Sequence, residues 1–215
     1  MREMPDKAFD LAIVDPPYGD ECDLANQSDS RWSVANGFSE LWIKNKQSKW
    51  NVRPPAEYFE ELKRVSKNQI IWGGNYFDLG QTPCYLIWDK GQRDFSFADA
   101  ELAWTSFETS VRIFTYPRSR LQTETRIHAT QKPVALYKWL LTNYAKQGDK
   151  ILDTHLGSGS SRIAAYDLGF DFTGYELDKD YFNAQEERFA RHIAQPQLFE
   201  IPRVDPIQEA MFAAA

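Results

Sequence analysis

Residues that build metal centres and disulfide frameworks are scarce in this sequence. The chain has 215 residues and contains 2 cysteines and 3 histidines. Cys22 and Cys84 stand alone, with no CxxC pair and no histidine at ligand spacing. The pattern therefore favours neither a metal site nor a disulfide scaffold. Two free thiols fit a reducing compartment, so we expect a cytoplasmic protein.

Long hydrophobic runs and an excess of positive charge are missing as well. No apolar stretch approaches the ~18 residues that a membrane span needs, and the N-terminal MREMPDKAF has no signal-peptide character. We therefore expect no membrane partner. The net charge is −6, from 25 Lys and Arg against 31 Asp and Glu. This balance argues against a protein that holds nucleic acid through its overall charge, although it leaves room for a local basic face.

Aromatic residues, in contrast, are abundant. They make up 14% of the chain, with 7 Trp and 10 Tyr. Such side chains fill a core, and they also suit a surface that stacks flat ligands. Hydrophobic residues account for 42%, and the length is sufficient for one domain with a sizeable core.

The order of the predicted elements indicates a single α/β domain with a largely parallel sheet. Strands at 98–107 and 111–116 are expected to be antiparallel at one edge of this sheet. We place one domain in residues 1–194, including a ligand-facing lid or peripheral insertion at about 19–55, and a loosely held tail in 195–215. The other expected strands lie near 11–14, 68–72 (with a break at Gly73-Gly74), 84–91, 150–153 and 172–175. The expected helices lie near 55–66, 133–145, after Gly159 and at 178–194.

One apolar strand runs directly into a rigid polar loop. Leu11–Val14 is followed by Asp15, Pro16, Pro17 and Tyr18. Because neither proline can donate a backbone N–H, they forbid both a continued strand and an immediate helix. A loop this stiff indicates that the acid and the tyrosine are held in a fixed relation to a ligand. The alternative is a rigid turn with a solvated Asp.

A glycine turn later in the chain is typical of a nucleoside site. A short strand reaches Asp153, Gly157 and Gly159 then open a helix, and Glu176 lies about 20 residues further on, where an acid can hold a ribose. A dinucleotide fingerprint would have a third glycine where this chain has Arg162. A nucleoside without phosphates fits better, and the carboxylate of Asp153 would then face a cation such as an amino group or a sulfonium.

Three sequence segments occur together in one order. They are DPPY at 15–18, HATQKPVAL at 128–136, and DTHLGSGSS with GYELDKDYF at 153–161 and 174–182. This combination resembles the β-group DNA amino-methyltransferases, the adenine-N6 and cytosine-N4 methylases that use S-adenosyl-L-methionine. The resemblance covers most of residues 8–190. It implies DNA as the partner and a Rossmann-like methyltransferase fold, a mostly parallel twisted sheet flanked by helices with an antiparallel strand at one edge.

The family's catalytic roles fall on the DPPY loop. The resemblance implies that Asp15 and the main-chain carbonyl of Pro16 accept hydrogen bonds from a target amine. Pro17 would keep the loop rigid, and Tyr18 would stack on the target base.

The family's cofactor roles fall on the other two segments. The glycine segment would line the methionine part of the cofactor, Glu176 would hold its ribose, and residues 130–132 would border its methionine end. The chain has Thr154-His155 where the family more often has Pro-Phe, and we expect the histidine to pack against the cofactor. No metal is implied. The implied cofactor residues are Asp153, His155, Leu156, Gly157, Gly159, Glu176, Thr130, Gln131 and Lys132.

The amine chemistry explains the acid, the two prolines and the tyrosine. An exocyclic amine is a poor nucleophile because its lone pair is delocalised into the ring. Acceptors held at its hydrogens favour a pyramidal nitrogen and free the lone pair for in-line attack on the sulfonium methyl. Because an amine inside duplex DNA is out of reach, the base must be flipped out and held by stacking.

Several alternatives remain at this point. Asp15 favours adenine N6, because the cytosine-N4 enzymes more often have Ser at that position, and cytosine N4 is the alternative target. A protein glutamine methyltransferase has Asn-Pro-Pro-Tyr but places its cofactor segment first in the chain. A dehydrogenase has no use for DPPY. A non-catalytic DNA- or cofactor-binding subunit is disfavoured by the intact Asp15 and Tyr18.

Target recognition is the least determined part of the prediction. The family's recognition region would correspond to about 109–127, which is short. Either recognition is simple, or the lid at 19–55 shares it, or a partner or a second copy in a homodimer supplies it. QPQLF at Gln195–Phe199 resembles a peptide that binds the bacterial sliding clamp; the alternative is a tail packed on the domain. We expect a bacterial or phage-encoded protein. The expected contacts with the DNA backbone are Lys44, Lys46, Lys49, Arg53, Arg112, Arg118 and Arg120.

Overall fold

The computed structural model describes residues 1–19, 52–91, 93, 98–117, 120, 127, 128 and 130–195. Nearly all of the predicted lid, much of the predicted recognition segment and the predicted clamp peptide after Gln195 lie outside the described residues. The described part contains the complete sheet discussed below and the helices that cover it.

Seven strands form one sheet in the order β5-β3-β4-β2-β1-β6-β7. Strand β1, which carries the apolar run before Asp15, lies inside the sheet between β2 and β6. The strands are β1 (Phe9–Val14), β2 (Ser66–Trp72), β3 (Tyr85–Asp89), β4 (Ala100–Thr105), β5 (Arg112–Thr115), β6 (Lys150–Asp153) and β7 (Asp171–Gly174).

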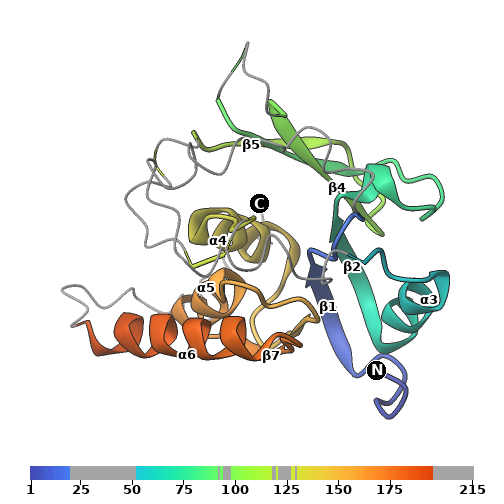
Figure 1. Ribbon diagram of the computed structural model, residues 1–215. Helices are drawn as coiled ribbons and strands as arrows, with labels where there is room; N and C mark the ends of the chain where they lie inside the picture. The colour runs from blue at the N-terminus through green and yellow to red at the C-terminus, as the bar shows by residue number, and fades with distance from the viewer. Residues whose placement is uncertain are drawn as a thin grey trace, which may run out of the picture.

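Helices cover both faces of the sheet around β1 and β2. Helix α3 lies on one side of these strands, and α4 and α5 lie on the other, with α6 alongside α5 (Figure 1). The helices are α3 (Ala56–Val65), the short 3-10 helix η2 (Gly74–Tyr76), α4 (Val134–Tyr144), α5 (Ser160–Leu168) and α6 (Lys179–Ala194). The alternation of strands and helices that the sequence predicts is thus confirmed.

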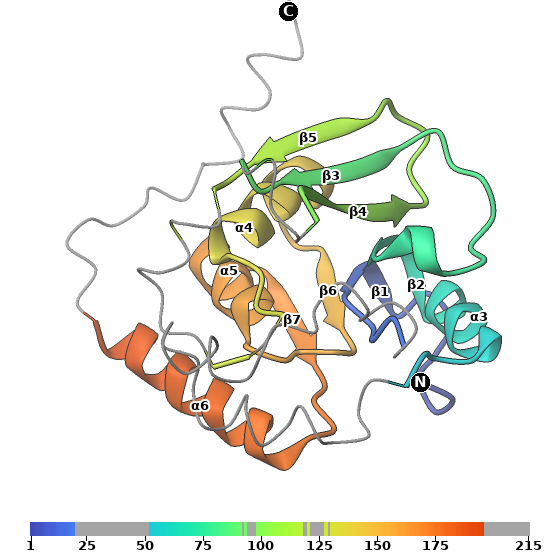
Figure 2. The same cartoon turned by 45° about the horizontal axis from the view of Figure 1, so that its top comes forward.

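One strand runs against the others, and its place corrects a prediction. β4 pairs antiparallel with both β2 and β3, whereas β5 pairs parallel with β3 (Figure 2). The fold class is confirmed, but the antiparallel strand is third from the end of the sheet, and the edge strand β5 is parallel. The cause is connectivity. After the connection 90–99, the chain returns beside β3 as the antiparallel strand β4, which also pairs with β2. Strand β5 then pairs with the outer side of β3.

Strand β1 is buried because both of its faces are covered. Leu11 and Ile13 pack in the cluster that includes α4 and α5, while Ala12 and Val14 pack in the cluster that includes α3. Each of these four side chains is at most 1% exposed. A strand buried on both faces has no polar side to alternate with, which explains its continuous apolar run and confirms the predicted core strand.

Helix α6 holds the glycine turn through one buried cation. Nη1 of Arg188 donates to the carbonyl of Ser158 at 2.8 Å and to the hydroxyl of Ser160 at 2.9 Å. Because Arg188 is buried, its charge depends on polar partners rather than on water. These bonds fix the turn between β6 and α5.

In the part of the chain that the structure covers, none of the helices combines the length and the apolar character that crossing a bilayer requires.

Replacing Arg188 should destabilise the fold through this turn. Arg188→Met removes two charge-assisted hydrogen bonds and leaves the Ser158 carbonyl without this donor. We expect the free energy of unfolding in urea to fall by about 2–3 kcal/mol. Arg191→Met is the matched control, because Arg191 is exposed on the same helix, and it should cost less than about 0.5 kcal/mol. Equal losses in the two variants would contradict the role given to Arg188.

Candidate active site

Polar residues at the ends of three strands meet at the carboxyl edge of the sheet. Asp15 follows β1, Asp153 ends β6, and Glu176 follows β7. β1, β6 and β7 are neighbours and run parallel, so their carboxyl ends share one edge. This edge is the usual ligand site of an open α/β sheet. The DPPY loop and the glycine turn, far apart in the sequence, are therefore side by side.

Asp15 is a largely buried carboxylate with a protein donor on each oxygen. The Tyr18 hydroxyl donates to Oδ1 at 2.8 Å, and the Lys132 ammonium forms an ion pair with Oδ2. Burial raises the pKa of Asp15; Lys132 opposes this rise, and the negative charge of Glu101 adds to it. Both acceptor oxygens of the predicted catalytic acid are thus engaged within the protein.

Lys132 lies with the catalytic loop. Its ammonium, which the sequence analysis placed at the methionine end of the cofactor, sits between Asp15 and Glu101, with Glu101 Oε2 at 3.1 Å. The side chain is 2% exposed, and Nζ stands 5.3 Å from the centre of the Trp72 ring. Burial alone would lower the pKa of Lys132, but the two carboxylates raise it, so the ammonium stays charged.

Glu101, at the start of β4, was not singled out from the sequence. Its Oε1 lies 2.8 Å from the Lys90 ammonium, and its Oε2 faces Lys132. Burial favours the neutral acid, but the two lysines outweigh it and lower the pKa of Glu101 to about 2. Lys90, Glu101, Lys132 and Asp15 therefore form a row of alternating charges, called the charge row below.

Tyr18 is held by packing as well as by its hydrogen bond. Its ring stacks on Tyr76 at 4.9 Å between centroids and meets the edge of Phe77 at 6.1 Å. On another side it lies directly against Gly73, where a Cβ would overlap the ring and where φ is +68°. The WGG sequence after β2 is thus explained by the close approach of this tyrosine.

Glu176 closes the glycine turn from the neighbouring strand. Its Oε2 accepts from the Gly157 N–H at 2.7 Å, and its Oε1 accepts from the Asp178 N–H at 2.9 Å. Leu156 is buried beneath the turn, and its N–H donates to the carbonyl of Tyr175 at 2.9 Å. The structure therefore brings together the glycines and the acid that the sequence analysis paired.

Asp153 supports the same turn from below. Its Oδ2 accepts from the Ser161 hydroxyl at 2.6 Å, and its Oδ1 accepts from the His155 N–H at 3.0 Å. The side chain is buried, and burial raises the pKa of Asp153 to about 7 despite these two donors. A cation bound nearby would favour the ionised form.

The Thr154-His155 pair finds a partner on α3. The Tyr58 hydroxyl lies 2.6 Å from Thr154 Oγ1 and 3.4 Å from His155 Nδ1. Burial lowers the pKa of His155 to about 4, so its ring is neutral near pH 7. The departure from the family's Pro-Phe thus coincides with a polar link between α3 and the segment after β6.

Residues 130 and 131 are engaged in local structure. Gln131 is buried, and its Oε1 accepts from the Ile127 N–H at 3.1 Å. The Thr130 hydroxyl is exposed and lies 3.2 Å from Nδ1 of His128, whose ring also packs on Tyr181. Burial and then Lys132 lower the pKa of His128 to about 4.

The predicted DNA contacts divide between the two ends of the sheet. Arg53 is exposed beside the DPPY loop, and its Nε donates to the Tyr18 carbonyl at 3.3 Å. Arg120 follows the carboxyl end of β5 and lies over Tyr116. Arg112 begins β5 and pairs with Leu86 near the start of β3, toward the opposite edge. Lys44, Lys46, Lys49 and Arg118 lie outside the described residues.

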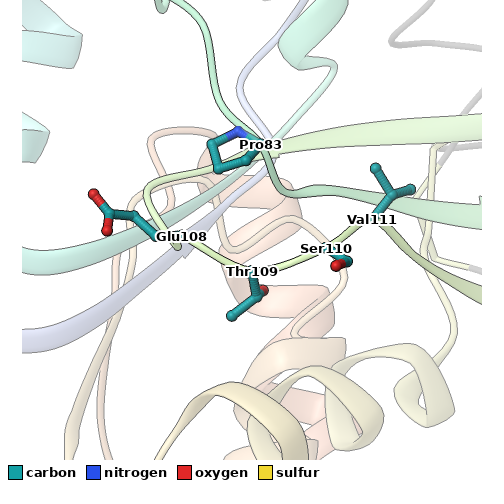
Figure 3. Close-up of a pocket in the computed structure, with 5 residues that line it drawn as sticks. All are labelled: Pro83, Glu108, Thr109, Ser110 and Val111. Carbon is teal, nitrogen blue, oxygen red and sulfur yellow. The ribbon is translucent and has the colours of Figure 1, made fainter.

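A second hollow lies at that opposite edge. Pro83 and the loop 108–111 line an open depression before β3 and β5 begin (Figure 3). Among the described residues that line it, Glu108 has the one charged side chain, which is exposed, so this lining lacks the converging charged groups of the carboxyl edge. Within the described ranges, no group of three or more His, Cys, Asp and Glu side chains could hold a metal ion.

Fold and site together define a class of protein. A mostly parallel sheet of seven strands, with a glycine turn after β6 and an acid after β7, is the arrangement of S-adenosylmethionine-dependent methyltransferases. The family model described as "DNA methylase", of the N6/N4 type, matches residues 36–187. The chain belongs to this family and is a DNA methyltransferase that acts on exocyclic amines.

Individual relatives agree with this family. The chain is 24% identical over 250 residues to type II methyltransferase M.HinfI of Haemophilus influenzae, covering 94% of this chain and 68% of that relative. It is 23% identical over 220 residues to type II methyltransferase M.HpaI of Haemophilus parainfluenzae, covering 87% and 70%. The solved PvuII DNA methyltransferase (cytosine-N4-specific) has a TM-score of 0.55 at 10% identity, covering 93% of this chain and 84% of that one. At this identity the likeness concerns the fold alone.

The raised pKa of Asp153 predicts a pH-dependent stability. A folded pKa of about 7, against 3.8 for an ordinary Asp, means that the folded state binds the proton more tightly than the unfolded state. This contribution to stability is complete below pH 4 and is lost as the pH rises through 7. Asp153→Asn removes the titration. Its free energy of unfolding relative to the wild type should therefore rise by about 2–4 kcal/mol between pH 4 and pH 8. A difference that stays constant with pH would contradict the assignment.

The contact between Gly73 and Tyr18 predicts a selective loss of activity. Gly73→Ala strains a backbone at φ +68° and displaces the Tyr18 ring. Gly80→Ala is a matched control, because its φ is +81° and nothing lies within 4 Å of the added Cβ. In thermal unfolding, Gly80→Ala should lose about 1 kcal/mol of stability, and Gly73→Ala should lose more, up to about 3 kcal/mol, because the Tyr18 ring must also move. Only Gly73→Ala should slow methyl transfer, by about tenfold or more. Equal transfer rates in the two variants would refute the placement of Tyr18.

Proposed function

We propose that this DNA methyltransferase transfers the methyl group of S-adenosylmethionine to the N6 amine of an adenine flipped out of DNA. The observation that carries the proposal is Asp15, a buried carboxylate on a Pro-Pro loop at the carboxyl edge of the sheet. The cytosine-N4 enzymes more often have Ser at this position of the motif, which supports adenine.

The residues around the glycine turn fit a nucleoside with a positively charged end. Leu177 is 100% exposed beside Glu176 and offers an apolar surface to a base. Asp153 is a buried carboxylate that a cation would stabilise. When bound, S-adenosylmethionine supplies an electrophilic methyl group on a sulfonium. The residues that would hold it are Asp153, His155, Leu156, Gly157, Gly159 and Glu176, with residues 130–132 at their border.

The DPPY loop would bind the target amine by exchanging one donor for another. Oδ1 of Asp15 now accepts from the Tyr18 hydroxyl, so an incoming amine must take that place. The Pro16 carbonyl would receive the second N–H, and the displaced Tyr18 ring would be available to stack on the base. Two prolines keep the carboxylate and the carbonyl at a fixed separation, which limits the reorganisation needed before attack.

Asp15 is also the group placed to take up the proton. When the amine nitrogen accepts a methyl group it becomes cationic, and one of its protons must leave. Burial has raised the pKa of Asp15, which makes this carboxylate a better proton acceptor than a solvated one. Lys132 keeps its own proton and remains a fixed positive charge behind the carboxylate.

DNA binding would rely on local cations, because the chain carries a net charge of −6. Arg53 and Arg120 are the described members of the predicted set that lie toward the carboxyl edge. Contacts of this kind with the backbone position the duplex without reading its sequence. We therefore propose a modest affinity that falls as the salt concentration rises.

The decisive test is transfer of labelled methyl groups to unmethylated genomic DNA, followed by nucleoside analysis. The wild-type chain should place the label in N6-methyldeoxyadenosine. Asp15→Ala removes the acceptor and should lower the rate by about 10²–10³-fold. Asp10→Ala is the control, because Asp10 lies in the same strand β1 but pairs with Lys67 at the far end, and it should keep the wild-type rate.

Each result of this assay has a distinct meaning. Label in N4-methyldeoxycytidine would replace adenine by cytosine as the target and would match the cytosine-N4 specificity of the PvuII enzyme. Bound cofactor without labelled DNA, over a range of salt concentrations and sequences, would contradict catalysis by this chain alone. An Asp15→Ala variant as fast as the wild type would remove Asp15 from the mechanism.

A further inference from the structure

The charge row contains one more acid than the amine chemistry requires. Lys132 alone would neutralise Asp15, yet the chain adds Glu101 and a second lysine, Lys90. The side chains of Glu101 and Lys90 are 24% and 11% exposed. Taking two further charges largely out of water is costly and is a weak way to stabilise a fold. Stability alone therefore does not explain the Lys90–Glu101 pair, and we look for its role in the active site.

The antiparallel strand brings Glu101 to this place. In the parallel strands, the residues at the carboxyl end reach the active edge, but in β4 it is the first residues that do so. Ala100 pairs with Asp89 at the end of β3, and Glu101 pairs with Trp88. Glu101 thus arrives at the same edge as Asp15 from a different direction.

The geometry around Lys132 limits where its charge can lie. The ammonium has three hydrogens. Asp15 Oδ2 and Glu101 Oε2 accept from two directions, and the face of the Trp72 ring lies on a third. If Glu101 were absent, the whole charge of Lys132 would fall on Asp15. A carboxylate bound that tightly is a weaker acceptor for a neutral amine.

We propose that Glu101 is a positioning residue for methyl transfer, which fixes Lys132 and shares its charge so that Asp15 remains free to accept the target amine. This inference rests on the proposed reaction but not on the identity of the base, because its readout is label in DNA. Glu101 acts through Lys132 and Asp15 and does not need to touch the reacting atoms itself.

The groups that face Asp15 determine the expected direction of a pH effect. Glu101 raises the pKa of Asp15, and Lys132 lowers it. Among the described residues, Tyr18 on the same loop, Tyr137 on α4 and Asp153 on β6 are further titratable groups that interact with Asp15. All of these except Glu101 stay unchanged in a Glu101→Gln variant. The loss of one negative charge should therefore lower the pKa of Asp15.

Two variants with opposite expected shifts test the proposal on the full-length chain. Glu101→Gln keeps the shape and one acceptor, and should lower the single-turnover rate by about 10–100-fold. It should also move the acid limb of the pH–rate profile to lower pH. In Lys90→Gln, Glu101 loses its ion pair with Lys90 and interacts more strongly with Lys132. Lys132 then stabilises the ionised form of Asp15 less, so the pKa of Asp15 should rise and the acid limb should move to higher pH. Binding of S-adenosylmethionine should change less than about twofold in both.

Glu108→Gln is the control, because Glu108 lies at the opposite edge of the sheet, and it should match the wild type in rate and in pH profile. Acid limbs that stay in place, or that move in the same direction in both variants, would overturn the proposal. If Glu101→Gln fails to fold, the shift of the acid limb in Lys90→Gln still tests the proposal. A Lys90–Glu101 pair with a merely structural role would leave that limb in place. A wild-type chain that labels no DNA would remove the proposed function and this inference together.

Discussion

An ammonium shared between two partly buried carboxylates is the interaction on which the active edge of this protein depends. Without Lys132, Asp15 and Glu101 would be like charges in a region with little water, a costly arrangement. With it, the loop after β1, the start of strand β4 and the segment before α4 meet at one point. The same ammonium lies over Trp72, at the end of β2. One cation thus links four elements that the chain connects only over long distances.

The sheet topology explains why such a convergence is available. A purely parallel sheet offers its active edge only the residues that end its strands. Here β4 runs the other way and contributes residues that begin a strand. The edge therefore receives Asp15 and Asp153 from parallel strands and Glu101 from the antiparallel one. The proposed catalytic acid Asp15 and the supporting acid Glu101 therefore approach this edge from strands of opposite direction.

Local features were predictable from the sequence, and long-range ones were not. The buried strand at 11–14, the rigid DPPY loop and the glycine turn each follow from a few neighbouring residues, and the structure contains all three. The partner of Asp15 could not be predicted in this way, because Lys132 is 117 residues away. The link from Tyr58 to Thr154 spans 96 residues. The predicted edge position of the antiparallel strand was wrong for the same reason. The sequence of two neighbouring strands does not say which other strand of the sheet they pair with.

The Tyr18 hydroxyl on Asp15 has a consequence for the choice between bases. In the proposed reaction, this hydroxyl takes the place of the substrate's N–H donor, so that the largely buried acceptor on Asp15 has a partner before DNA binds. A base with an exocyclic amine can replace the hydroxyl one for one. Thymine has a carbonyl acceptor where cytosine has its amine, so by entering it would remove a donor from Asp15 and place an acceptor there instead. An unsatisfied buried acceptor costs about 1–3 kcal/mol, or roughly 5–150-fold in affinity. The resting hydrogen bond thus already disfavours a wrong base before any methyl group moves.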